Sequence, residues 1–151
     1  MAENPDFASI DRFFVYGTLC RGQCRERCWP CQPLVVTPAW TWDKLYGRAD
    51  YPAMRPGTDR VIGECWRFAS DDLPRVRSVL DQIEVTGQPG VPNLYDPVVV
   101  EVYDLRSIQQ EAISSAHCIG SAHAYHYSTP PEQDGFAWIT PQNGQGVRWP
   151  A

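Results

Sequence analysis

Hydrophobic residues gather along the chain in short runs that predict strands separated by turns. The first run lies inside residues 12–17 and is continuously apolar and β-prone, which is typical of a buried strand. The second predicted strand is expected to be interrupted near Pro38. The complete set of predicted strands covers residues 12–17, 34–42, 61–68, 98–103 and 122–127.

The clearest helical pattern follows residue 70. Ser70 is the expected N-cap, and Asp71 and Asp72 fall in the first turn, where the helix dipole favours negative charge. Gly87 and Pro89 end the pattern. The apolar face expected at helical spacing comprises Leu73, Val76, Val79 or Leu80, and Ile83. A second, shorter helix is expected over residues 23–31.

This order of elements predicts an α+β fold with a curved sheet or small barrel. Fourteen prolines and 11 glycines favour many short elements with sharp turns. A length of 151 residues favours one domain over residues 1–151. Within it we expect a loose leader at 1–11, an inserted loop or short helix at 108–120, and a tail at 130–151 that wraps the surface.

Composition narrows the classes of function. Hydrophobic content of 43% and charged content of 21% are ordinary for a soluble globular protein. A net charge of −5 without a basic run argues against nucleic acid as a partner. The polar N-terminus does not resemble a signal peptide, and no apolar stretch approaches the ~18–20 residues that span a bilayer. A cytoplasmic protein with reduced thiols and no membrane partner is therefore expected.

The end of the first predicted strand carries the most informative motif. An apolar run stops at Tyr16, Gly17, Thr18 and Leu19. Gly17 permits a sharp turn and close approach of another group. The peptide N–H groups of Gly17, Thr18 and Leu19 can then form a small anion-binding cradle. The alternative is a strand that ends in an ordinary turn.

Several further segments, taken in chain order, resemble one family. Together they resemble the γ-glutamylcyclotransferase-like superfamily, in particular its AIG2-like branch, over roughly residues 12–127. The segments are Tyr16 to Leu19, Arg21-Gly22-Gln23, Leu45-Tyr46-Gly47, Tyr51 to Met54, Pro56-Gly57, Val61 to Trp66, Leu80 to Glu84, Tyr95, Val98 to Val102 and Ala124 to Tyr127.

The resemblance implies a small mixed β-barrel with flanking helices and a cavity at the barrel mouth. It implies that the turn formed by Tyr16, Gly17, Thr18 and Leu19 binds a γ-glutamyl group through backbone N–H contacts. It also implies that Glu84 is the general acid/base that helps convert a γ-glutamyl amine or amino acid to 5-oxoproline. The implied partner is this small-molecule substrate, and the implied reaction needs no cofactor and no metal.

Elementary chemistry is consistent with that role for Glu84. The α-amine and the γ-carbonyl belong to one molecule, so the site mainly folds the substrate for attack. One carboxyl can take and return the proton if its pKa lies near neutrality. A helix C-terminus and an apolar cavity both raise the pKa of a carboxyl group. The alternative is a solvated surface carboxylate.

Nearby residues admit structural roles. Tyr16 either lines the pocket or packs in the core, and core packing is expected for Tyr95 and Tyr125. Asp81 is expected on the helix surface or as a hydrogen-bonding cap. Glu64 is expected to face outward or to pair with Arg60 or Arg67.

The chain departs from the family pattern after the predicted helix. The family often has tyrosine, one variable residue and arginine there, whereas this chain has Tyr95, Asp96 and Pro97. The segment 85–94, with two glycines and two prolines, is also long. Because of both changes, the sequence does not identify the particular substrate.

Four cysteines crowd into the segment after the motif. Cys20, Cys24, Cys28 and Cys31 admit a zinc site or, by the spacing of the last three, an iron–sulfur cluster. The simpler interpretation is one apolar face of the short predicted helix. Two alternatives to the enzyme remain. One is a non-catalytic small-molecule binder on the same fold, and the other is a cysteine-rich metal-binding protein.

Overall fold

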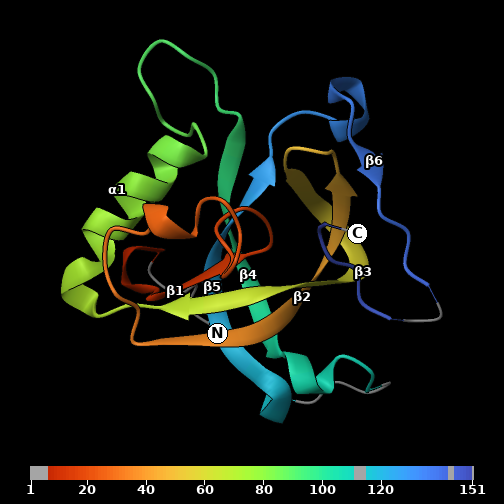
Figure 1. The fold of residues 1–151 in the computed structure, drawn as a ribbon. Coiled ribbons are helices and arrows are strands. Elements are labelled where there is room, and N and C mark those ends of the chain that lie inside the picture. The colour runs from red at the N-terminus through yellow and green to blue at the C-terminus, as the bar shows by residue number, and fades with distance from the viewer. Residues whose placement is uncertain (1–6, 111–114, 143–144, 151) are drawn as a thin grey trace, which may run out of the picture.

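Five strands close into a barrel, with a sixth short strand added at one end (Figure 1). The computed structural model describes residues 7–110, 115–142 and 145–150. Strand β1 is parallel to β5 and all other neighbours are antiparallel, so the barrel is mixed, as expected. The barrel order is β1–β5–β4–β2–β3, and β3 returns to β1. The strands are β1 (Arg12–Val15), β2 (Val35–Gly47), β3 (Pro52–Arg67), β4 (Tyr95–Asp104), β5 (Cys118–Tyr127) and β6 (Ala137–Trp138).

Helix α1 (Leu73–Ile83) lies beside the barrel (Figure 1). Leu73, Val76 and Leu80 are buried, which confirms the predicted apolar face. The expected N-cap was wrong: a 3-10 turn, η3 (Ser70–Asp72), precedes the helix, and Asp72 occupies the cap position without a side-chain bond. A proline in the first helical turn explains the later start, because its fixed φ suits that position. Among the described residues, no helix is long and apolar enough to cross a membrane.

Strand β1 separates two hydrophobic cores. Phe13 and Val15 point toward α1 and pack with the cluster that contains Leu80. Phe14 points the other way, into the barrel interior, where it packs with a cluster that contains Met54 and Val61. A strand buried on both faces explains why the sequence of β1 is apolar without alternation.

The hairpin of β2 and β3 is longer than the sequence pattern suggested. Strand β2 continues through Pro38, which pairs with Glu64 of β3. Pro38 lies one residue before Ala39, the first β2 residue that pairs with β4, so proline interrupts no bond on the β4 side. Strand β3 begins at Pro52 rather than 61. A bulge opposite Asp43 and Lys44 bends the hairpin, and a Cβ on Gly57 would lie 2.5 Å from the Lys44 Cβ.

The segment 23–31 is not an α-helix. It contains only the 3-10 turn η2 (Glu26–Cys28), preceded by tight turns with i to i+3 bonds such as Gln23 N–H to Cys20 O. The Glu26 side chain accepts from the N–H of Gly22, whose φ is +82°, so the chain folds into successive turns here.

Both ends of the described chain contribute to the core. Residues 1–6 lie outside the described residues, but the leader from Phe7 onward is packed rather than loose. Ile10 is buried and the Phe7 ring contacts the His123 ring edge-on. In the tail, Phe136 and Val147 are buried. These segments pack through single apolar residues, which are too sparse to form a helical or strand pattern in the sequence.

The expected insertion at 108–120 is partly strand. Strand β5 starts at Cys118, after the 3-10 turn η5 (Ser115–His117). The 3-10 turn η4 (Leu105–Ser107) precedes the segment, and residues 111–114 lie outside the described residues. The segment expected as an insertion therefore begins directly after η4, the turn that follows the end of β4.

Candidate active site

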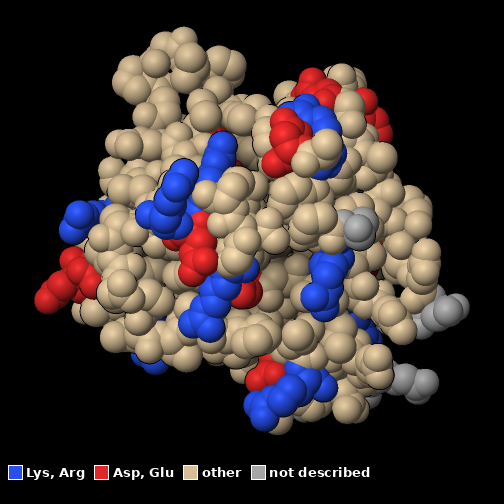
Figure 2. All heavy atoms as spheres, viewed as in Figure 1, with Lys and Arg blue, Asp and Glu red and all other residues tan. Residues whose placement is uncertain are grey.

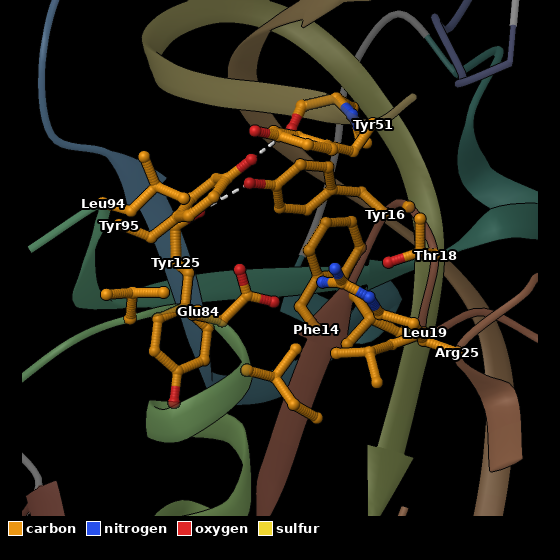
Figure 3. A pocket seen from close by; sticks show the side chains of 15 residues that line it. Phe14, Tyr16, Thr18, Leu19, Arg25, Tyr51, Glu84, Leu94, Tyr95 and Tyr125 are labelled. Carbon is orange, nitrogen blue, oxygen red and sulfur yellow. Dashed lines mark hydrogen bonds between the residues drawn. The ribbon is translucent and has the colours of Figure 1, made fainter. Parts of the chain in front are cut away.

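A cavity of about 160 Å³ lies between the turn after β1 and the C-terminal end of α1 (Figure 3). It is smaller than the ~300–1,000 Å³ typical of sites for drug-sized molecules, so it suits a ligand about the size of one amino acid. The structure brings all five predicted site residues to it. The lining residues are Phe14, Val15, Tyr16, Gly17, Thr18, Leu19, Arg25, Tyr51, Pro52, Ile83, Glu84, Val85, Leu94, Tyr95 and Tyr125.

The turn at residues 16–19 presents peptide groups to the cavity. The N–H groups of Gly17, Thr18 and Leu19 donate to no group within the described part of the chain. Gly17 is required by close packing: a Cβ there would lie 2.6 Å from Cγ of Pro52. Glycine at this position therefore lets Pro52 pack against the turn, and the free N–H groups are donors available to an anionic oxygen.

Hydrogen bonds from outside the turn fix its shape. The N–H of Arg25 donates to Thr18 O at 2.8 Å, and the N–H of Cys20 donates to Gly17 O at 3.1 Å. Glu64 accepts from the N–H of Arg21 at 2.8 Å and from the Trp66 indole at 3.2 Å. Among the described residues Glu64 therefore pairs with neither Arg60 nor Arg67, which was one of its two expected roles. It instead ties the turn to β3.

Glu84 lies at the C-cap of α1, where its N–H donates to Leu80 O at 2.8 Å and its carbonyl accepts from the N–H of Tyr95 at 3.2 Å. Its carboxyl group points into the cavity (Figure 3). Burial raises the pKa of this carboxyl to about 7, partly opposed by the positive charge of Arg25. A carboxyl with this pKa has both protonation states populated near neutral pH.

Val85 ends the helix in an unusual conformation. Its φ is +53°, the left-handed region that a β-branched residue rarely adopts. The N–H of Thr86 donates to Asp81 O and the N–H of Val85 to Gln82 O, which is the bonding pattern of a Schellman motif. Glycine usually occupies this position, so Val85 adds strain beside the Glu84 carboxyl.

Three tyrosines form much of the remaining wall. Tyr16 donates its hydroxyl to Tyr125 O at 2.6 Å, and Tyr95 donates to Pro52 O at 2.7 Å (Figure 3). Tyr125 donates to a carboxylate oxygen of Asp81 at 2.7 Å, so Asp81 is a hydrogen-bonding partner on the helix. Burial raises the pKa of Tyr16 well above its usual value. These residues thus pack in the core and line the cavity at the same time.

Sequence reasoning missed Arg25 as a lining residue. It lies in the segment expected to be a helix, and its N–H donates to Thr18 O of the 16–19 turn, which is beside the cavity. Pro97, at the family arginine position, is exposed and does not line the cavity, whereas Val85 and Leu94 bring both ends of the 85–94 segment to it.

The four crowded cysteines do not converge. Within the described residues, which include all six cysteines, no group of three or more His, Cys, Asp or Glu side chains is arranged to hold a metal ion. Cys24 and Cys28 are exposed, and Cys20 is half-buried with its thiol donating to Val15 O. Figure 2 shows both basic and acidic side chains spread over one face of the molecule.

The fold and the cavity define a small barrel protein with a carboxyl-bearing pocket at the barrel mouth. The sequence model of the family described as "Gamma-glutamyl cyclotransferase, AIG2-like" matches residues 13–144. The chain belongs to this family, and a cyclotransferase-like function in general follows from that membership. No curated protein sequence matches the chain significantly.

Solved structures share the fold at low sequence identity. An AIG2-like protein from Mus musculus superimposes with a TM-score of 0.57 at 18% identity, covering 89% of this chain and 88% of the mouse chain. An Arabidopsis thaliana protein gives 0.56 at 18%, covering 89% and 72%. YkqA from Bacillus subtilis gives 0.56 at 16%, covering 90% of this chain but 39% of YkqA. The chain thus spans about two fifths of YkqA, and these likenesses show the fold alone.

Proposed function

We propose that the protein cyclises a γ-glutamyl amine or amino acid to 5-oxoproline and free amine, with Glu84 as general acid/base. The observation that carries this proposal is the half-buried Glu84 carboxyl, which points into a cavity that the turn with the free N–H groups of residues 17–19 also lines. Family membership supports the same class of reaction.

In the proposed reaction the neutral α-amine of the substrate attacks its own γ-carbonyl carbon. A C–N bond forms, and negative charge develops on the carbonyl oxygen. The N–H groups of Gly17, Thr18 and Leu19 are available to stabilise that oxygen, a type of contact worth about 10²–10³ in rate for each donor.

Glu84 then moves one proton. Its carboxylate takes the proton from the attacking nitrogen and returns it to the leaving nitrogen as the original amide bond breaks. The products are the lactam and the free amine, and Glu84 ends in its starting state. A pKa of about 7 suits both halves of this transfer.

The test is a panel of γ-glutamyl amides and amino acids, with 5-oxoproline measured by chromatography. We expect turnover of at least one member and a loss of about 10²–10⁴-fold in Glu84→Gln, because the amide keeps the shape but cannot carry the proton. Glu132→Gln, at an exposed site on the 3-10 turn η6 (Pro131–Asp134), is the matched control and should retain full activity.

The panel also separates the enzyme from a binder. No turnover of any member, combined with binding of 5-oxoproline in calorimetry, would identify a non-catalytic binder instead. Equal activity in Glu84→Gln and wild type would remove Glu84 from the chemistry.

A further inference from the structure

Arg25 is the single basic side chain among the described residues that line the cavity. Its guanidinium points toward the Glu84 carboxyl from the opposite wall (Figure 3). The guanidinium forms no hydrogen bond or ion pair with any residue that the structure describes, although the Arg25 backbone does. Arg48 and Arg55 do not line the cavity and are engaged elsewhere, because Arg48 pairs with Asp50 and Arg55 donates to Tyr127 O. Arg25 therefore presents unused donors to whatever enters the cavity.

The backbone holds Arg25 at this place. Its N–H donates to Thr18 O at 2.8 Å, and its carbonyl accepts from the N–H of Cys28 at 2.9 Å. Arg25 is an exposed residue although it lines the cavity, so its charge stays hydrated. An exposed guanidinium on a fixed backbone can exchange water for a planar carboxylate in a two-bond contact at little cost.

The two charges match one chemical group. Glu84 offers a negative charge and Arg25 a positive one, across a cavity about the size of an amino acid. An α-amino acid head group carries an ammonium and a carboxylate on one carbon. If the nitrogen lies at Glu84, as the proposed function requires, the carboxylate on the same carbon faces the opposite wall.

We propose that Arg25 binds the α-carboxylate of the γ-glutamyl group and makes this carboxylate a condition of efficient turnover. The inference rests on the proposed function and names the part of the substrate that the site selects. Arg25 thereby also orients the α-amine toward Glu84, because the two groups share a carbon. The leaving amine is not part of this selection.

The test compares two amides with the same leaving amine, a γ-glutamyl amide and the 4-aminobutanoyl amide. Both close the same five-membered lactam, and they differ only in the α-carboxylate. In Arg25→Met we expect kcat/KM to fall about ten- to a hundredfold for the γ-glutamyl amide and to stay within about threefold for the 4-aminobutanoyl amide. Arg27→Met, an exposed arginine on the same segment that does not line the cavity, should change neither.

A binding measurement keeps the inference testable without turnover. By calorimetry, wild type should bind 5-oxoproline about ten- to a hundredfold more tightly than 2-pyrrolidone, which lacks the carboxylate, and Arg25→Met should abolish that preference. Circular dichroism checks that the variant is folded.

Three results would overturn the inference. They are equal losses for both amides in Arg25→Met, an unchanged preference for 5-oxoproline in that variant, and no preference in wild type. An equal loss with a changed pH profile would instead make Arg25 a counter-ion of Glu84 only. If no amide is turned over but Arg25→Met abolishes the binding preference, the cyclisation fails and carboxylate recognition stands.

Discussion

Replacing Glu84 by glutamine should remove a loss of stability that the wild-type protein undergoes as the pH rises from 4 to 8. The Glu84 carboxyl has a pKa of about 7 in the folded protein, against an ordinary value of 4.5. Between these two values the folded state holds a proton that the unfolded chain has released. The free energy of unfolding therefore falls as pH rises through this window, and the loss is complete above the folded pKa.

The size of the effect follows from the two pKa values. At about 1.4 kcal/mol per pKa unit, the interval from 4.5 to about 7 corresponds to about 3 kcal/mol. Glu84→Gln has no proton to release, so it lacks this loss. Relative to wild type, the variant should gain about 3 kcal/mol between pH 4 and pH 8, whatever constant offset the amide introduces.

Urea unfolding of both proteins at several pH values from 4 to 8 measures this gain. The slopes with denaturant must agree, so that midpoints report stability alone. Glu132→Gln is the control, and its difference from wild type should not change with pH. A Glu84→Gln difference that is flat within about 0.5 kcal/mol from pH 4 to pH 8 would refute the argument that burial raises this pKa.

Three further substitutions test the packing around the cavity. Gly17→Ala should cost about 1–3 kcal/mol in urea unfolding and most of the activity, because its Cβ meets the Pro52 ring at 2.6 Å. Leu80→Ala should cost about 2–5 kcal/mol, because Leu80 is fully buried between α1 and the barrel. Tyr125→Phe should cost about 1–3 kcal/mol, because the Asp81 carboxylate loses its 2.7 Å donor.

Each of these has a result that contradicts it. Gly17→Ala with wild-type stability and activity would show that Pro52 moves aside, and rescue of the variant by Pro52→Ala would support the clash. A cost below about 1 kcal/mol for Leu80→Ala would mean that the helix does not pack as described. Tyr125→Phe as stable as wild type would mean that water replaces the tyrosine hydroxyl.

The sequence predicted the parts of the site that depend on local pattern. The apolar run before Gly17 identified the strand and its turn, and helical spacing up to Ile83 located Glu84 at the helix end. The prediction of a mixed barrel came from the family resemblance, because no local sequence pattern indicates how strands close into a barrel. The mixed pairing of β1 with both β3 and β5 depends on contacts far apart in the chain.

The rest depended on tertiary contacts that no short window contains. Arg25 reaches the cavity through a bond to Thr18, seven residues earlier in a chain of irregular turns. The first half of β3 was not predicted as a strand, because it contains prolines and a glycine near the bulge. Pro38 was misjudged because its tolerance depends on where β4 ends.

Glu84 and Val85 are neighbours, and the fold holds each in a state that costs free energy. The Glu84 carboxyl is partly desolvated in the cavity, and Val85 is a β-branched residue at a φ of +53°. Selection for heat resistance alone should therefore favour substitutions at these two residues early, because a replacement at either one can stabilise the folded protein. Variants obtained in that way should survive heating better while losing turnover. A laboratory evolution experiment that screens only for survival would erase the proposed chemistry first at the end of α1.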